Sequence, residues 1–306
     1  MTGFPGAAVN QQGGRGPWAA RKLEVSGRRI TYWATDKRDQ QLLFLHGTSA
    51  HSLWWHAVIP HLADEFQCIA IDNSGHGDSS HTPHYTPQNW IEEIRAVSTH
   101  ENLDRPVVVG HSRGGRLAVL LATAYDAFAR GLVLMDSGIR PPEDYRPPMP
   151  PLGRPQRIYD SFDDARRHFR LLPVQTPPPA DVMDPVAAYS LHRTDTGWTW
   201  KYDVGTLFNL DDDEVGAALP KIRVPVAMAY GELSTVVTDK FAQYMTENLP
   251  LIASARLPAA EHHLILSHPD ESADFIRHTA QAMYSGPAAA AAGDFPLKPA
   301  LVHPVS

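Results

Sequence analysis

The segment from Pro106 to Gly115 (PVVVGHSRGG) places a serine hydroxyl where it could act as a nucleophile. Gly110, Ser112 and Gly114 form a Gly-x-Ser-x-Gly motif that follows a β-branched run and precedes the helical pattern of residues 116–125. Small flanking residues permit a sharp turn from strand to helix, from which the hydroxyl projects clear of the backbone. The helix N-terminus below it favours developing negative charge. We therefore predict that Ser112 attacks a carbonyl carbon.

A second turn could supply the hydrogen-bond donors that such an attack requires. The apolar run that begins at Leu42 ends at His46-Gly47, where the glycine lets the backbone turn sharply. The turn could aim the amide of Thr48 or Ser49 at the reacting carbonyl. Together with the amide of Arg113, the residue after the nucleophile, it would form an oxyanion hole. We predict Thr48 and Arg113 as the donors, with Ser49 as the alternative to Thr48.

The elements around these turns follow the pattern of an α/β protein. Short apolar runs alternate with helical patterns, which predicts a mostly parallel sheet with helices on both faces. The runs are residues 29–34, 42–46, 68–72, 106–111, 131–136, 224–230 and 255–257.

Five segments, in this order and at these intervals, resemble the α/β-hydrolase superfamily. They are HGTSAHSLWW, DNSGHGDS, GHSRGG, VAMAYGELSTVV and LPAAEHHLILSHPDE, and the likeness runs from about residue 23 to residue 284. The resemblance implies a mostly parallel eight-stranded α/β-hydrolase sheet flanked by helices, a cap over the active site, and the chain order nucleophile, acid, histidine. The serine at position 112 points away from haloalkane dehalogenases and epoxide hydrolases, which use aspartate there.

The same resemblance selects a base among the 16 histidines. His262 lies in the loop where the superfamily carries its histidine, between a short strand and the helix that begins near His268. The family form of this loop is Pro-Gly-Ala-Gly-His. Here Glu261 replaces the last glycine and His263 follows directly, but the spacing from Pro258 favours His262. We predict His262 as the general base.

The acid departs from the family pattern. The usual aspartate lies three residues after the glycine that ends strand seven, but Gly231 is followed by Glu232, Leu233, Ser234 and Thr235. Two candidates remain: Asp136, at the end of the run LVLMD, and Glu232. Some superfamily members supply the acid from strand six, and Asp136 preserves the expected chain order. We predict Asp136, with Glu232 as the alternative.

Prolines and small residues suggest how the chain is divided. The proline-rich stretch 141–155 interrupts the strand pattern, which resumes only at Val224. Both ends lack an amphipathic pattern and are expected to be flexible tails. The expected division is a tail at 1–18, a core at 19–138 and 221–284, a mainly helical cap at 139–220, and a tail at 285–306.

Four tryptophans are candidates for the substrate pocket. Trp198 and Trp200 alternate in GWTWKYD as in a strand, and with Trp54 and Trp55 they could line an apolar pocket. They could equally pack the cap on the core, and the sequence does not decide between these roles. The features together favour a carboxylesterase-type serine hydrolase acting on a small-molecule carboxylic ester. A lactonase, amidase or C–C bond hydrolase, or a non-catalytic small-molecule receptor of this fold, remain alternatives.

Composition and charge limit the classes of partner that the sequence favours. With 43% hydrophobic and 20% charged residues, the chain is typical of soluble globular proteins. A formal charge of -7 and scattered Lys and Arg residues argue against nucleic acid as a partner. No run approaches the roughly 20 apolar residues of a membrane span, and the N-terminus lacks a signal-peptide pattern, so we expect a cytoplasmic protein.

Cysteine and histidine spacing predict neither disulfides nor a metal. The single cysteine, Cys68, lies in an apolar run and is expected to pack in the core. His51, His56 and His61 recur every five residues, a spacing that spreads them around a helix. No His-Glu-x-x-His motif or pair of cysteines occurs. We expect no metal and no other cofactor.

Overall fold

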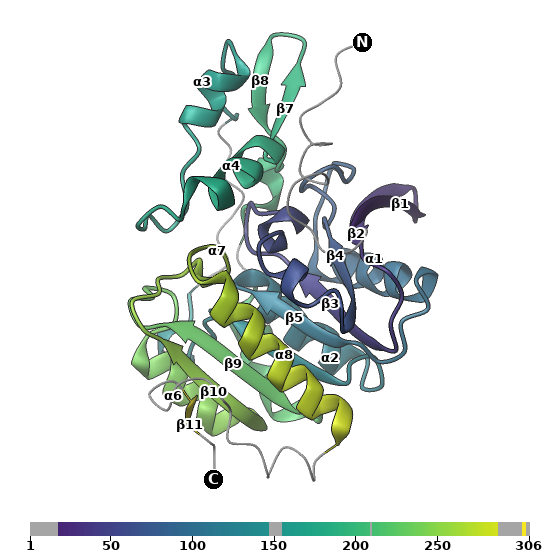
Figure 1. Cartoon of the computed structure of the whole chain (residues 1–306), viewed down its shortest axis with the longest axis vertical. Helices are drawn as coiled ribbons and strands as arrows, with labels where there is room; N and C mark the ends of the chain where they lie inside the picture. Colours follow the sequence, from purple (N-terminus) through teal and green to yellow (C-terminus); the bar gives the residue numbers. More distant parts are fainter. Residues whose placement is uncertain (1–17, 147–154, 209, 287–301, 304–306) are drawn as a thin grey trace.

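A single central sheet organises the computed structural model, which describes residues 18–146, 155–208, 210–286 and 302–303 (Figure 1). The strand order is β1-β2-β4-β3-β5-β6-β9-β10-β11. β2 pairs antiparallel with β1 and β4, whereas all neighbours from β4 to β10 pair in parallel. Apart from the two-residue β11, the sheet has the eight mostly parallel strands of the expected α/β-hydrolase fold, which is confirmed.

The elements have the following bounds. The sheet contains β1 (Ala19–Val25), β2 (Arg28–Ala34), β3 (Gln40–Leu45), β4 (Phe66–Ile71), β5 (Val107–His111), β6 (Gly131–Met135), β9 (Val226–Gly231), β10 (Leu251–Leu257) and β11 (Val302–His303). The helices of the core are α1 (Pro87–His100), α2 (Arg113–Ala124), α5 (Asp212–Ala218), α6 (Asp239–Asn248), α7 (Leu264–Ser267) and α8 (Pro269–Ser285). The strand β1 was not among the expected runs.

The apolar runs form strands because both faces of the sheet are buried. In β3, Leu43 and Leu45 pack into one hydrophobic cluster, and Leu42 and Phe44 pack into another on the opposite face. The first cluster includes residues of α1, α2, α5 and α6, and the second includes residues of α8. Helix α8 crosses in front of β9 and β10 in Figure 1. The sheet is thus a rigid support between two helical layers.

The insertion between β6 and β9 stands partly off the core (Figure 1). It contains α3 (Phe162–Arg167), α4 (Ala180–Tyr189) and a hairpin of β7 (Leu191–Thr194) and β8 (Gly197–Trp200). Its last helix, α5, instead packs on α2 and joins it through a buried ion pair between Arg116 and Asp212. The cap boundary at residue 220 stays a prediction. Within the insertion, α3 and the hairpin stand away from the core, whereas α4 packs on the core: Val186 belongs to a core cluster, and the hydroxyl of Tyr189 donates to Asp72 at 3.1 Å.

The expected tails lie mostly outside the described residues, which omit 1–17, 287–301 and 304–306. Trp18 stacks on Trp33, with ring centroids 5.6 Å apart. At the other end, β11 pairs antiparallel with Ser254 and Ala255 of β10. The C-terminal segment therefore contributes two residues to the edge of the sheet.

We expect removal of residues 287–306 to leave ester turnover unchanged. The described residues of the deleted part form the short β11 ladder, at a sheet edge far from the turn that carries Ser112. The melting temperature should fall by less than about 3 °C, which corresponds to roughly 1 kcal/mol in a protein of this size. Thermal melts and initial rates of the shortened and full chains measure both effects. A larger drop would show that this segment contributes substantially to stability.

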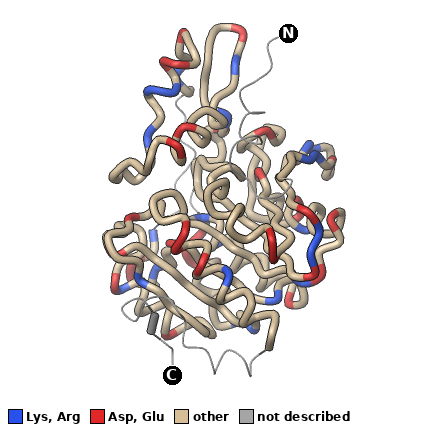
Figure 2. The backbone as a smooth tube through the Cα atoms, in the orientation of Figure 1, with Lys and Arg blue, Asp and Glu red and all other residues tan. Residues whose placement is uncertain are grey.

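Charged side chains of both signs are interspersed along the described backbone (Figure 2). This agrees with the scattered positions of Lys and Arg in the sequence. Among the helices the structure describes, none is both long and apolar enough to cross a membrane.

Candidate active site

The turn after β5 holds Ser112 in a conformation that few residues adopt. Its φ is 54° and its ψ is -122°, and the helix α2 begins at the next residue. A Cβ atom at Gly110 would lie 2.4 Å from the amide nitrogen of Gly115, and one at Gly114 would lie 2.3 Å from the carbonyl oxygen of Leu45. Only glycine fits at both flanks, because no real Cβ approaches backbone so closely. The motif therefore forms the expected sharp strand-to-helix turn, with Ser112 partly exposed.

Three side chains from separate elements meet at this turn. The Ser112 hydroxyl lies 3.0 Å from Nε2 of His262, and Nδ1 of His262 lies 2.8 Å from Oδ1 of Asp136. Because a carboxylate only accepts, Nδ1 carries the proton and Nε2 is left to accept from the serine. Parallel strands bring these residues together, since their carboxyl ends share one edge of the sheet. The arrangement can remove a proton from Ser112 and stabilise the resulting imidazolium.

The Asp136 carboxylate is completely buried and fixed by two further donors. Oδ2 accepts from the amide of Gly231 at 2.8 Å, and Oδ1 also accepts from the hydroxyl of Ser234 at 2.7 Å. Its backbone has a φ of 44°, in the left-handed region. Glu232 lies apart from this group: its side chain is exposed and accepts from the amide of Ala259 at 3.0 Å. The structure thus brings Asp136, and not Glu232, to His262.

Ser234 is a functional candidate that the sequence analysis did not single out. It occupies the place three residues after Gly231 where the family carries its aspartate. Besides donating to Asp136, its Oγ accepts from the amides of Val236 and Val237, each at 3.1 Å. The sequence contained a signal for this role, because a serine at that position can donate a hydrogen bond to a carboxylate from the neighbouring strand.

The turn that precedes Thr48 and the start of α2 at Arg113 both lie beside Ser112. A Cβ atom at Gly47 would lie 3.2 Å from Cβ of Ser112, so the chain leading to Thr48 passes directly against the nucleophile. The amide of Arg113 is at the first position of α2 and has no acceptor within the helix. Among the described residues, neither amide donates a backbone hydrogen bond. Ser49, the alternative, has a positive φ of 57°.

The side chain of Arg113 is a buried cation without a carboxylate partner among the described residues. Its guanidinium donates to the carbonyl of Thr206 at 2.7 Å and to Nε2 of His76 at 2.8 Å, and it stacks on Trp90. Burial lowers the pKa of Arg113 to about 9. These contacts tie the start of α2 to the loop after β4 and to the base of the insertion, which holds the backbone around Ser112.

The loop that carries His262 also contacts the cap. Gln175 accepts from the amide of His263 at 2.8 Å, and Nε2 of His263 donates to the carbonyl of Leu172 at 3.1 Å. Glu261, which replaces the family glycine, accepts from the amide of Thr176 at 2.9 Å. Three hydrogen bonds therefore join residues 172–176 to the loop of the base.

The four tryptophans divide into two pairs. Trp54 lies near the site, with its ring 5.0 Å from that of His263, whereas Trp55 is fully buried against Phe44. Trp198 and Trp200 lie on β8 and pack on α3 and its flanking residues in a small cluster of the cap. Trp198 and Trp200 therefore pack the cap internally, and the structure does not place them between the cap and the core.

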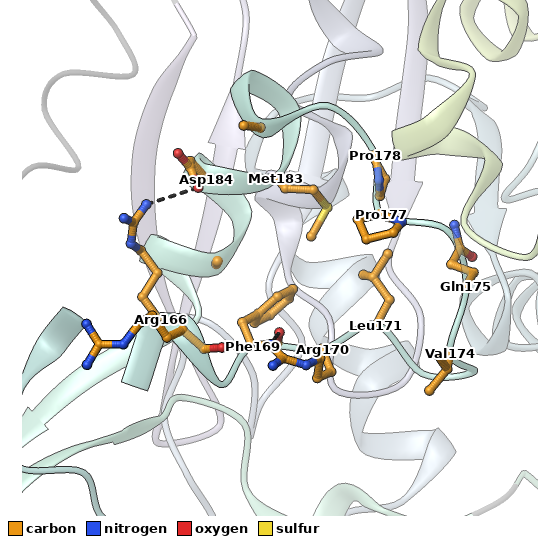
Figure 3. A pocket seen from close by; sticks show the side chains of 13 residues that line it. Arg166, Phe169, Arg170, Leu171, Val174, Gln175, Pro177, Pro178, Met183 and Asp184 are labelled. Atoms are coloured by element: carbon orange, nitrogen blue, oxygen red, sulfur yellow. Dashed lines mark hydrogen bonds and ion pairs between the residues drawn. The ribbon is translucent and has the colours of Figure 1, made fainter. Parts of the chain in front are cut away.

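A cavity of about 490 Å³ lies within the cap, between α3, α4 and the segment that joins them (Figure 3). Its lining is apolar on one side and carries arginines on the other. Lining residues include Phe169, Leu171, Met183, Arg166, Arg170 and Gln175. Arg166 pairs with Asp184 at 3.0 Å on one side of the cavity (Figure 3). Because Gln175 binds the amide of His263, the wall of the cavity adjoins the loop of the base.

The chain is similar to known proteins along most of its length. The family model described as alpha/beta hydrolase family matches residues 42–275. The chain spans a little over a third of the length of the curated relatives it matches first. One of them is epoxide hydrolase 1 of Caenorhabditis elegans, 28% identical over 49% of this chain and 35% of the relative.

A longer match is to a pimeloyl-[acyl-carrier protein] methyl ester esterase of Yersinia pseudotuberculosis. It is 26% identical over 82% of this chain and 97% of that protein. Among solved structures, the thioesterase domain from the curacin biosynthetic pathway superposes with a TM-score of 0.71 and 20% identity, covering 85% of this chain and 99% of that domain. At this identity the structural likeness shows the fold alone.

Proposed function

Since the chain belongs to the alpha/beta hydrolase family, we propose that it is a carboxylesterase-type serine hydrolase that cleaves a small-molecule carboxylic ester. The observation that carries the proposal is the continuous hydrogen-bonded series from Ser112 through His262 to Asp136. A long match to a relative named as a methyl ester esterase supports the choice of an ester.

The reaction follows from the protonation states that the hydrogen bonds impose. His262 takes the proton of Ser112 as its oxygen attacks the ester carbonyl, and Asp136 stabilises the imidazolium. The amides of Thr48 and Arg113 bind the oxyanion. His262 then gives the proton to the leaving alcohol, and an acyl-enzyme forms. Water, activated by the same imidazole, releases the acid and restores Ser112.

A fluorophosphonate probe combined with p-nitrophenyl esters distinguishes an esterase from the alternative functions. We expect labelling of the protein and turnover of at least one ester in a chain-length series. Preferential turnover of lactones or amides would transfer the assignment to those substrates, which share the same three residues. Labelling without turnover of any ester would favour a small-molecule receptor of this fold.

We further propose that the cap cavity accepts the apolar part of the substrate. Its apolar lining and its contact with the loop of His262 support this assignment. The variant Met183→Trp should lower kcat/KM for long-chain esters by roughly tenfold or more. The acetyl ester should be affected much less, because its acyl group would not reach Met183.

The matched control for this test is Asp181→Trp, which introduces the same side chain at an exposed position of the same helix. It should leave the preference for chain length unchanged. An equal loss for short and long esters in Met183→Trp, or the same loss in both variants, would remove the cavity from the substrate path.

A further inference from the structure

Three buried histidine rings gather at the catalytic turn. His111 is the last residue of β5, while His262 and His263 are adjacent in the loop after β10. Ring nitrogens from all three lie within 4.8 Å of one another. The ring centroids are 4.9 Å apart for His111 and His262, 4.6 Å for His262 and His263, and 5.5 Å for His111 and His263.

Hydrogen bonds to carbonyl groups determine which nitrogens carry protons. Nε2 of His111 lies 3.0 Å from the carbonyl oxygen of His262, and Nε2 of His263 lies 3.1 Å from that of Leu172. A carbonyl only accepts, so each Nε2 is protonated and each Nδ1 carries a lone pair. Nδ1 of His262 donates to Asp136, which leaves its Nε2 bare as well. All three rings therefore present one nitrogen with a free electron pair.

The bare nitrogens of His111 and His263 are buried and have no hydrogen-bond partner in the described part of the chain. The residues are 1% and 3% exposed. Buried polar atoms usually have partners, so two orphaned acceptors beside a nucleophile need an explanation. A Cβ atom at Gly47 would lie 3.2 Å from both Nδ1 of His111 and Cβ of Ser112, which places this nitrogen next to the nucleophile.

We propose that His111, His262 and His263 form an inhibitory site for a borderline divalent cation such as Zn²⁺. Imidazole nitrogen suits zinc, copper and nickel, whereas magnesium and calcium require oxygen ligands. Tetrahedral zinc with bonds of about 2.0–2.1 Å holds two nitrogens about 3.4 Å apart, so ring nitrogens that lie within 4.8 Å of one another need to approach by at most about 1.4 Å. Water or the Ser112 hydroxyl fills the fourth position.

Inhibition follows because the cation and the reaction need the same electron pair. The lone pair on Nε2 of His262 accepts the proton of Ser112 in the proposed mechanism, and a bound cation occupies it. No bond within the protein is made or broken, so removal of the cation restores the base. This inhibition rests on the proposed function, but binding of the cation does not, and the two can be measured separately.

Binding is tested with Co²⁺ as a spectroscopic substitute for Zn²⁺, in full-length Ser112→Ala protein. This variant keeps all three rings and has no nucleophile. We expect the visible absorption of four-coordinate cobalt at one equivalent, and its loss when Zn²⁺ is added. His263→Gln on this background should weaken binding about tenfold or more, because it removes one nitrogen while its amide can still donate to Leu172.

The matched control is His100→Gln, which removes an exposed histidine at the end of α1, outside the cluster, and should not alter cobalt binding. A six-coordinate cobalt spectrum, or equal affinity with and without the His263 ring, would overturn the proposed site. These outcomes do not depend on whether the protein hydrolyses an ester.

Inhibition is tested in the protein with Ser112 intact. Zn²⁺ should reduce both ester turnover and fluorophosphonate labelling, EDTA should restore both, and Mg²⁺ should have no effect. His263→Gln should need a Zn²⁺ concentration about tenfold higher or more for the same fractional inhibition as the unchanged protein, each measured against its own metal-free rate. Zinc that binds at the cluster without slowing turnover would refute the inhibition, whereas absence of turnover in metal-free protein would refute the proposed function alone.

Discussion

Replacement of Ser112 by alanine is expected to lower ester hydrolysis by about a thousandfold or more, because the proposed acyl-enzyme can no longer form. The fold should persist. The side chain is partly exposed at the turn, and its one hydrogen bond is to His262, so its loss removes little packing. Initial rates with p-nitrophenyl esters and a thermal melt of the same preparation measure the two expectations.

A matched control for this variant is Ser80→Ala. It removes the hydroxyl of another serine, whose Oγ accepts a hydrogen bond from the amide of Arg29. It should keep most of the activity. Retention of most activity in folded Ser112→Ala would end the assignment of this serine as nucleophile.

The variant Asp136→Asn should lower turnover by a factor on the order of ten thousand, the loss known for the equivalent change in a Ser-His-Asp triad. The amide keeps the shape of the side chain but cannot hold the proton on Nδ1 of His262 or stabilise the imidazolium. Substrate binding should change far less than turnover. Steady-state kinetics separate the two effects, and a melt checks that the buried position still folds, since Asp136 also accepts from Gly231 and Ser234.

Glu232→Gln is the matched control, because Glu232 was the alternative acid and its exposed side chain lies away from His262. It should cost tenfold or less. A double variant, Asp136→Asn with Ser234→Asp, should regain part of the lost turnover, because it returns a carboxylate to a position beside residue 136. A larger loss in Glu232→Gln than in Asp136→Asn would reverse the assignment of the acid.

The positions of the central strands in the sequence were predictable because buried parallel strands are continuous apolar runs, and β3, β5 and β6 all show them. The strand β1 was missed for the opposite reason. Its residues are mostly exposed at the sheet edge, so AARKLEV lacks the apolar signal that marks a central strand. A strand is therefore recognisable from its apolar residues only where the sheet buries them.

The turn of Ser112 was predictable because its glycines are required by local contacts. Asp136 was predicted as the partner of His262 from its place in the chain, but its contact with Ser234 was not, since the two meet across neighbouring strands and sequence spacing holds no record of that contact. The same limit hid the histidine cluster: His111 and His262 are 151 residues apart. Likewise, the alternation of Trp198 and Trp200 fits either a pocket or a packed hairpin, and only tertiary contacts distinguish them.

The central claim, an acyl-enzyme on Ser112, is tested most directly by mass spectrometry of protein quenched with acid during turnover of a p-nitrophenyl ester. We predict one added acyl group per chain, located by digestion on the peptide that contains Ser112 and lost in Ser112→Ala. Two results would contradict the account. One is ester turnover with the acyl group on another residue, and the other is turnover with burst kinetics but no acylated protein.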